Sequence, residues 1–314
     1  MTMQVVSDLA ALRQRPFPGI ICGVGVFDGV HLGHQAILRG VVAQPRAGGG
    51  TPAVFTFLNH PLTVLAPSRA PRLITPPPLK TRILEEQGIA LTIGVPFTLA
   101  MAALSPETFV RDVLVGQVGV RGVHVGADFR FGRGREGTPE DLIRLGAALG
   151  FTVKVVPEVA VGGTPVHSTL IRELLAQGKL REAQTFLGRP YLVLGAIEVG
   201  AGRGKALGFP TANLDGGEVL VPDGIYAGRA RAAGEWRKAV MSLGVAPTFG
   251  GTRRLLEVHF LPPLTEAIGP GVELTVALLH RIRDEIRFPD AAALVAQMRQ
   301  DVAFAERLLA AENS

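Results

Sequence analysis

The chain has 314 residues, of which 47% are hydrophobic and 19% charged, and its formal net charge is +5. This composition is typical of a soluble globular protein with two domains of ordinary size. Aromatic residues make up only 6% and the basic residues are scattered, which argues against nucleic acid as the main partner. No apolar run approaches the length of a membrane span, and the start of the chain lacks the features of a signal peptide. The single cysteine excludes a disulfide within the chain, and we expect a cytoplasmic protein with no membrane partner.

A glycine-rich turn near the start joins a strand to a helix. Residues 20–27 form an apolar run that predicts a short buried strand, and residues 35–39 predict a helix. Such a turn is suited to bind phosphate, because its free backbone N–H groups and the positive end of the helix dipole can face an anion. His31 and His34 fall on one side of the first helical turn, and Gly33 leaves room for a ligand. Similar turns in many α/β proteins bind nothing, and a metal site would need a third ligand that no nearby residue supplies.

Strands and helices then alternate as far as residue 187. The expected strands cover residues 52–57, 91–95, 120–125 and 151–156, and the expected helices cover residues 79–87, a segment capped by Ser105, and residues 168–187. This alternation predicts a parallel sheet with right-handed crossovers. His60 follows one of these strands, and Asp128 and Phe129 follow another. Ligands bind at such strand ends, although an ordinary solvated loop is the common alternative.

The last helix of this half begins with a second candidate anion site. Ser168 or Thr169 can cap the helix, and Arg172 falls in its first turn. A capped helix start with an arginine attracts an anion. The same residues can equally form only a cap, as they do in most helices.

The pattern changes at residues 188–191. Short alternating runs follow without helices between them, at residues 191–199, 224–232, 236–243, 255–261 and 272–280. Closely spaced strands of this kind predict a small antiparallel barrel, on which a final helix at residues 290–311 packs. We therefore expect one domain at residues 1–187 and another at 188–314.

The second domain contains a glycine-rich loop with two cations. Residues 200–208 can surround phosphates with backbone N–H groups, but they lack the Gly-Lys-[Ser/Thr] ending of a Walker A loop. Thr211 and Asn213 supply neutral oxygens suited to Mg²⁺. A flexible hairpin explains the same residues equally well.

Taken together, these motifs resemble those of the prokaryotic bifunctional riboflavin kinase/FMN adenylyltransferase (FAD synthetase) family. Residues 27–35 resemble its HxGH nucleotidylyltransferase segment, and residues 207–213 resemble its riboflavin kinase signature. Further matching segments lie, in order, at residues 126–132, 168–172, 244–251, 256–260 and 283–288. The resemblance implies an α/β fold with an N-terminal Rossmann-like nucleotidylyltransferase domain, followed by a C-terminal antiparallel β-barrel with a C-terminal helix.

The resemblance also implies roles for particular residues. The residues implied to be catalytic are His31, His34, Arg172 and Glu257. The residues implied to bind nucleotide in the first domain are Gly25, Phe27, Asp28, Gly29, Gly33, Ser168 and Thr169. Those implied in the second domain are Gly200, Gly204, Lys205, Gly208, Pro210 and Thr211. His60, Asp128 and Phe129 are implied to bind the flavin, and Thr211 and Asn213 are implied to bind Mg²⁺. The chain departs from the family pattern at Asn59, His167, Val199 and Ala201.

Two ATP-dependent activities in one chain are implied. The barrel would phosphorylate riboflavin to FMN with Glu257 as the base, and the first domain would transfer AMP from a second ATP to FMN. The products would be FAD and pyrophosphate, and Mg²⁺ would accompany ATP. The alternative is an HxGH nucleotidylyltransferase for another phosphate acceptor, with a barrel that binds flavin without catalysis. The sequence leaves the oligomeric state open.

Overall fold

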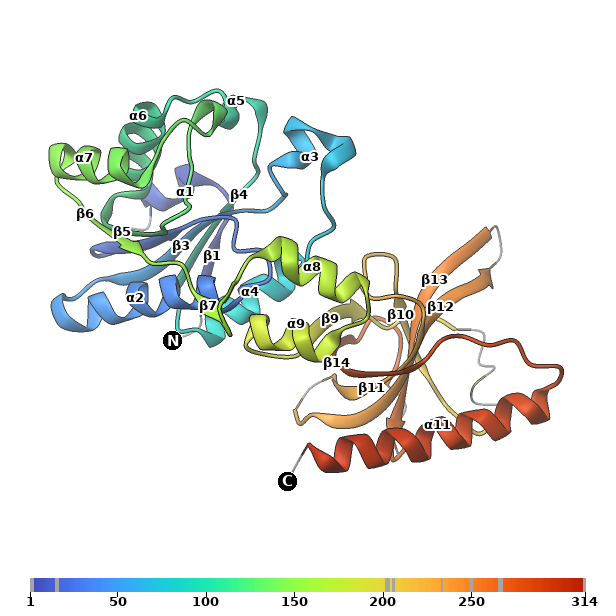
Figure 1. Cartoon of the computed structure of the whole chain (residues 1–314). Coiled ribbons are helices and arrows are strands. Elements are labelled where there is room, and N and C mark those ends of the chain that lie inside the picture. Colours follow the sequence, from blue (N-terminus) through green and yellow to red (C-terminus); the bar gives the residue numbers. More distant parts are fainter. Residues whose placement is uncertain are drawn as a thin grey trace. The chain divides into compact units, whose positions relative to one another are not determined.

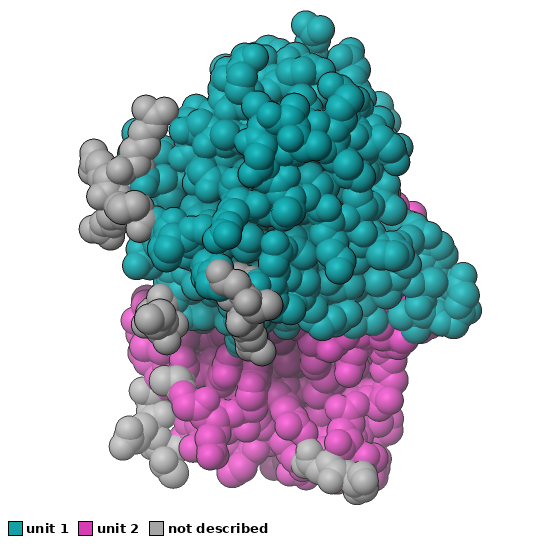
Figure 2. Space-filling view, turned by 90° about the vertical axis from the view of Figure 1, so that its left-hand side faces the viewer, with its two compact units in different colours: residues 1–168 teal, residues 169–314 magenta. Residues whose placement is uncertain are grey.

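The computed structural model describes residues 3–14, 17–200, 204, 207–232, 234–248, 251–264 and 268–312. The chain folds as two compact units, Met1–Ser168 and Thr169–Ser314, which are coloured separately in Figure 2. Within the described ranges, no helix combines the length and the apolar character needed to cross a bilayer.

The first unit is built on a six-stranded sheet with the strand order β1-β4-β3-β2-β5-β6. Its strands are β1 (Gln4–Val6), β2 (Ile20–Val24), β3 (Thr51–Phe57), β4 (Leu91–Val95), β5 (Val120–Gly126) and β6 (Thr152–Val156). Every pair of neighbours runs parallel, which confirms the sheet predicted from the alternation of strands and helices. A small hairpin of β7 (Ala160–Val161) and β8 (Thr164–Pro165) follows β6.

Helices cover both faces of this sheet, as right-handed crossovers between parallel strands require (Figure 1). One face carries α2 (Leu32–Gly48) and α4 (Pro77–Glu86), and the other carries α6 (Pro106–Thr108) and α7 (Pro139–Leu149). The remaining helical segments are α1 (Leu9–Gln14), α3 (Leu62–Leu65), η1 (Pro67–Arg69), α5 (Leu99–Ala102), η2 (Phe109–Val118) and η3 (Arg133–Arg135).

The core of this unit explains why its central strands are so apolar. Strands β2 and β4 are buried along their whole length, because both faces of the sheet are covered. Phe55, Ile93, Val113 and Leu142 belong to one cluster between the sheet, η2 and α7. The predicted cap at Ser105 is confirmed, because its side chain accepts the N–H of Thr108.

The second unit holds a six-stranded antiparallel sheet with the order β10-β13-β12-β11-β14-β9. Its strands are β9 (Tyr191–Ala196), β10 (Ala212–Asp215), β11 (Gly224–Arg231), β12 (Arg237–Thr248), β13 (Gly251–Leu261) and β14 (Glu273–Arg283). The two edges of the sheet meet where the N–H of Glu198, just after β9, donates to the carbonyl of Asn213 in β10 at 2.8 Å. The sheet therefore closes into a near-barrel, which confirms the predicted architecture.

A long C-terminal helix, α11 (Ala291–Ala311), packs on β11, β12 and β14 (Figure 1). Asp290 caps it by accepting the N–H of Ala293. The buried residues Asp301, Ala305 and Leu309 are spaced by four and form one stripe. The predicted final helix is confirmed.

The single helix predicted over residues 168–187 is wrong. The structure has two helices there, α8 (Ser168–Ala176) and α9 (Leu180–Leu187). Gly178 between them has a φ of 73°, a left-handed conformation that glycine adopts without strain and that ends a helix. The second helix, α9, packs against β9 and β14 of the barrel.

Candidate active sites

The parallel sheet has one point where its strand order reverses. Strands β3 and β4 lie on one side of β2, and strands β5 and β6 lie on the other. In open α/β sheets, ligands bind at the carboxyl ends of the strands at such a point. The turn with His31 follows β2, the segment with Asp128 follows β5, and His60 follows the neighbouring β3. The structure therefore brings three motifs to one edge of the sheet.

The turn after β2 has a strained backbone. Phe27 has a φ of 51° and Val30 a φ of 39°, values that are uncommon for residues other than glycine. Both side chains are fully buried, so packing holds these conformations in place. Gly33 lies close to the turn, and a Cβ at this position would make a tight contact of 3.2 Å with the His31 ring. A Cβ at Gly25 would lie 3.3 Å from the Phe27 ring.

The two histidines of the turn lie against each other. Their ring centroids are 3.6 Å apart and the ring planes differ by 16°. His31 is buried, and its Nδ1 accepts the backbone N–H of His34 at 3.4 Å. Because Nδ1 accepts, the neutral ring of His31 carries its proton on Nε2, which is then a hydrogen-bond donor.

Asp28 holds this turn to a distant loop. Its buried carboxylate accepts the backbone N–H of Ile74 at 2.9 Å and that of Thr75 at 3.0 Å. The N–H of Gly29 donates to the Thr75 hydroxyl at 2.6 Å. The Asp28 carboxylate and this N–H therefore fix the turn within the protein. Ile74 and Thr75 were missed by sequence reasoning, and no local pattern points to partners 46 residues away.

Ser168, the last residue of the first unit, also contacts the turn. The Ser168 hydroxyl donates to the backbone carbonyl of Asp28 at 2.9 Å. The neighbouring His167, where the family pattern has serine, pairs through Nε2 with the Glu158 carboxylate at 3.1 Å. Thr169 and Arg172 follow on α8, in the second unit.

The segment after β3 is held by an asparagine where the family pattern has proline. The Asn59 amide donates to the carbonyl of Phe97 at 3.1 Å and accepts the N–H of Phe97 at 2.7 Å. The next residue, His60, accepts the N–H of Leu62 on Nδ1 at 3.2 Å. Asn59 thus fixes the segment that carries His60 to the chain that follows β4.

Aromatic rings gather at the same edge of the sheet. Phe129 stacks on Phe131 with the centroids 5.4 Å apart, and Phe57 contacts Phe97 edge to face at 5.0 Å. Asp128 lies over Gly126, where a Cβ would come within 2.9 Å of its carboxylate. Flat apolar surfaces beside a carboxylate suit a planar heteroaromatic ring with polar edges.

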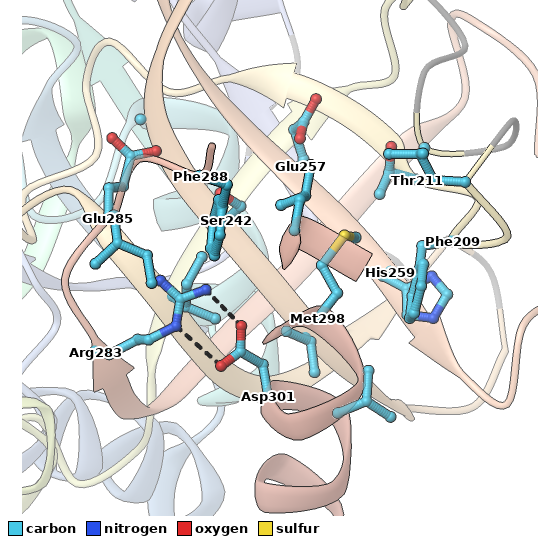
Figure 3. A pocket seen from close by; sticks show the side chains of 18 of the residues that line it. Phe209, Thr211, Ser242, Glu257, His259, Arg283, Glu285, Phe288, Met298 and Asp301 are labelled. Atoms are coloured by element: carbon cyan, nitrogen blue, oxygen red, sulfur yellow. Dashed lines mark hydrogen bonds and ion pairs between the residues drawn. The ribbon is translucent and has the colours of Figure 1, made fainter. Parts of the chain in front are cut away.

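The barrel contains a cavity of about 600 Å³, large enough for a cofactor-sized ligand (Figure 3). Apolar residues form most of its wall, among them Leu207, Phe209, Ile225, Val240, Met298 and Val302. The polar side chains that line it are Thr211, Ser242, Glu257, His259, Arg283, Glu285 and Asp301. The cavity thus combines an apolar wall with a few convergent polar groups.

Glu257 lies between two other strands of the barrel. On β13 it stands opposite Asn213 of β10 on one side and Ser242 of β12 on the other. The Oδ1 atom of Asn213 is buried and has no hydrogen-bond partner in the described structure. A Cβ at Gly200 would collide with the amide nitrogen of Asn213, so glycine allows the loop to approach. A buried, unpaired oxygen beside a carboxylate-bearing strand is a fitting ligand for a hard cation.

The glycine-rich loop is described in part. Lys205 lies outside the described residues, whereas Gly200, Gly204 and Gly208 lie within them. A Cβ at Gly204 would collide with the carbonyl of Phe209 and lie 3.1 Å from the Thr211 hydroxyl. The carbonyl of Pro210 accepts a hydrogen bond from Nδ1 of His259 at 2.9 Å. His259, a residue that sequence reasoning missed, therefore anchors the exit of this loop to β13.

A double ion pair joins the C-terminal helix to the cavity wall (Figure 3). The guanidinium of Arg283 on β14 donates to both carboxylate oxygens of Asp301, at 2.9 and 2.6 Å, and Gln297 adds a third bond at 3.0 Å. Asp301 is only 5% exposed. The signal that could have revealed it is a charge on the apolar stripe of α11, because a buried carboxylate needs a partner.

Removing one partner of this pair leaves the other charge poorly compensated. We expect Asp301→Ala to lower the free energy of unfolding of the second unit by about 3 kcal/mol and to raise the KM for the ligand of the cavity. Urea unfolding of the full chain measures the first effect. Glu306→Ala, an exposed carboxylate on the same helix, is the matched control. Equal stabilities of the two variants would contradict the importance of the pair.

Glu285 adds a third carboxylate to the cavity, beside Glu257 and Asp301. Burial raises its pKa, and the neighbouring carboxylates of Asp223 and Glu257 raise it further, while Arg283 opposes them. Figure 3 shows Glu285 on the opposite side of the Arg283 guanidinium from Asp301. The guanidinium that could offset Glu285 is therefore already paired with Asp301.

The first unit has the sheet topology of nucleotide-binding α/β domains, and the second unit is a barrel with a carboxylate-lined cavity. Two family models match the chain: FAD synthetase at residues 14–170 and riboflavin kinase at residues 187–309. The bifunctional riboflavin kinase/FMN adenylyltransferase of Escherichia coli strain K12 is 35% identical over 95% of this chain and 96% of its own length. The Bacillus subtilis protein of the same name is 33% identical over 90% of each chain.

The chain therefore belongs to the bifunctional riboflavin kinase/FMN adenylyltransferase family. It is an enzyme that converts riboflavin to FMN and FMN to FAD at the expense of ATP. A crystal structure described as a macrolide-efflux protein from Streptococcus pneumoniae is also similar, with a TM-score of 0.82, 27% identity and coverage of 98% of this chain and 99% of that one.

Proposed function

We propose that adenylyl transfer takes place at the turn that carries His31 and His34. An oxygen of the FMN phosphate attacks the α-phosphorus of ATP, and the bond to the bridging oxygen breaks as pyrophosphate leaves with the electron pair. The protein contributes positioning and charge stabilisation. The stacked pair of imidazoles supports this role most directly, because the Nε2 proton of His31 can be donated to the phosphates as charge builds on the leaving group.

The start of α8 completes this site in our proposal. Ser168, Thr169 and Arg172 hold the pyrophosphate with hydroxyl groups, the helix N-terminus and a guanidinium. The bond from the Ser168 hydroxyl to the carbonyl of Asp28 supports the assignment of Ser168. Gly25, Phe27, Asp28, Gly29 and Gly33 act by shaping the turn that receives the nucleotide. His60, Asp128 and Phe129 receive the flavin of FMN beside the aromatic rings.

In the kinase site, Glu257 acts as the general base. It accepts the proton of the riboflavin 5′-hydroxyl while that oxygen attacks the γ-phosphorus of ATP, and ADP leaves with the electron pair of the broken bond. Its place on the cavity wall supports the role. The loop with Gly200, Gly204, Lys205 and Gly208, followed by Pro210, covers the ATP phosphates.

We assign Mg²⁺ to Thr211 and Asn213, whose neutral oxygens suit a hard cation. The buried, unpaired Oδ1 of Asn213 supports this assignment. When bound, Mg²⁺ neutralises charge on the ATP phosphates. No cluster of three or more His, Cys, Asp or Glu that could hold a metal is found among the described residues.

Removal of the asparagine oxygen tests the metal assignment. We expect Asn213→Ala to raise the Mg²⁺ concentration needed for half-maximal riboflavin phosphorylation by about tenfold, equivalent to roughly 1.4 kcal/mol of lost metal binding. A Mg²⁺ titration of FMN formation measures it, and the Mg²⁺ dependence of FAD formation from FMN serves as the internal control. An unchanged titration of the kinase would remove Asn213 from the metal site.

We place the boundary between the two catalytic domains at residues 187/188. The start of the riboflavin kinase match at residue 187 and the left-handed Gly188 at the end of α9 support it. Residues 1–187 then carry the adenylyltransferase and residues 188–314 the kinase. Both reactions consume ATP, which fits the cytoplasmic location expected from the sequence.

The acceptor of the adenylyl group is tested by competition. Full-length protein is incubated with ATP, Mg²⁺ and an equimolar mixture of FMN and other phosphomonoesters, and the products are separated by chromatography. We expect FAD to be the main adenylylated product. Preferential adenylylation of another phosphate would instead favour a nucleotidylyltransferase with a different acceptor.

A further inference from the structure

A buried lysine lies beneath the proposed adenylylation site. Lys80 on α4 is 4% exposed. Its Nζ lies 3.1 Å from the carbonyl of Val26, 3.0 Å from the carbonyl of Phe57 and 3.3 Å from the hydroxyl of Thr56. An ammonium has three donors, so each of them has an acceptor here. Burial lowers the pKa of Lys80 to about 8, and the Asp28 carboxylate opposes this shift.

The acceptors belong to two different strand ends. Val26 stands between β2 and the turn that carries His31, whereas Phe57 is the last residue of β3 and precedes the segment that carries His60. The Thr56 hydroxyl also donates to the carbonyl of Val26, at 2.9 Å. One ammonium thus joins the two neighbouring strands where both turn towards the ligand edge.

The residue next to Val26 shows why this bond matters. Phe27 has the left-handed φ of 51°, and such strain persists only where surrounding contacts hold it. The Asp28 carboxylate holds the turn from the far side through Ile74 and Thr75. Lys80 holds the turn through the carbonyls of Val26, just after β2, and Phe57, at the end of β3. Without the ammonium, the partly buried carbonyls of Val26 and Phe57 lose a charged donor.

We propose that Lys80 is a positioning residue for adenylyl transfer, which fixes the strained turn of His31 relative to the turn of His60. The proposal rests on the proposed function of the His31 turn. It accounts for a buried charge that neither reaction uses directly. A displacement of about 1 Å at a reacting group costs on the order of 10²-fold in rate.

The test compares Lys80→Met and Lys80→Arg in the full-length chain, with Lys154→Met at an exposed lysine of β6 as the matched control. For Lys80→Met we expect kcat for FAD formation from FMN to fall by about 10²-fold, with a much smaller change in KM for ATP. Lys80→Arg keeps the charge and the donors and recovers at least a tenth of the wild-type kcat. Riboflavin phosphorylation in the same molecules stays unchanged.

Thr56→Val provides a second variant that preserves side-chain size. Loss of its hydroxyl lowers kcat for FAD formation by about tenfold, and the effect is not additive with that of Lys80→Met, because both act on Val26. A wild-type-like kcat in Lys80→Met overturns the proposal, and if that variant does not fold, a wild-type-like kcat in Thr56→Val overturns it. If His31→Ala forms FAD from FMN at the wild-type rate, the proposed function of the His31 turn has failed, and not the role of Lys80 alone.

Discussion

Replacement of Glu257 by glutamine is expected to slow riboflavin phosphorylation by about 10²–10⁴-fold, the usual span for loss of a general base. Glutamine keeps the size of the side chain and its place on β13 but cannot accept the hydroxyl proton at neutral pH. FAD formation from supplied FMN should remain at the wild-type rate, because the adenylylation residues lie in other elements.

Single-turnover formation of FMN, followed by chromatography, measures this effect. Glu218→Gln, an exposed carboxylate of the same unit, is the matched control and should retain activity. If Glu257→Gln phosphorylates riboflavin at the wild-type rate, the base lies elsewhere. Glu285, which shares the cavity, would then be the next residue to replace.

Replacement of His31 by alanine is expected to slow FAD formation by about 10²–10³-fold, as for loss of one transition-state donor. FMN should accumulate when the variant is supplied with riboflavin and ATP. His34→Ala should have a comparable effect, because the two imidazole rings are stacked and each supports the position of the other.

The rate of pyrophosphate release with FMN as the substrate measures this effect, and kinase activity in the same preparation reports on folding. Unchanged pyrophosphate release in both variants would refute the role of the histidines. A loss of both activities at once would instead indicate a general folding defect.

Periodicity and turn chemistry predicted most of the fold. The parallel sheet, the barrel and α11 followed from local patterns, because a strand buried on both faces and an amphipathic helix leave clear signals. The predicted helix over residues 168–187 failed at Gly178, since an isolated glycine within an apolar repeat does not reveal its own φ. The predicted strand over residues 20–27 ends at Val24, where the strained turn begins.

The sequence motifs predicted which segments gather at each site, but not the contacts that hold them. These contacts link residues that are distant in sequence. They are the bonds from Ile74 and Thr75 to Asp28, the three bonds of Lys80, and the pair of Arg283 with Asp301. No local pattern encodes such partners. The departure at Asn59 became interpretable only from the structure, which shows its amide paired with both polar backbone groups of Phe97.

The stoichiometry of the complete reaction is the most direct test of two sequential ATP-dependent steps in one chain. Full-length protein is supplied with riboflavin, excess ATP and Mg²⁺, and flavins, ADP and pyrophosphate are followed together. The account predicts that FMN appears first and FAD follows, with one ADP formed per riboflavin phosphorylated and one pyrophosphate per FAD. Pyrophosphate formation without any conversion of riboflavin to FMN, or FMN formation that never proceeds to FAD, would contradict it.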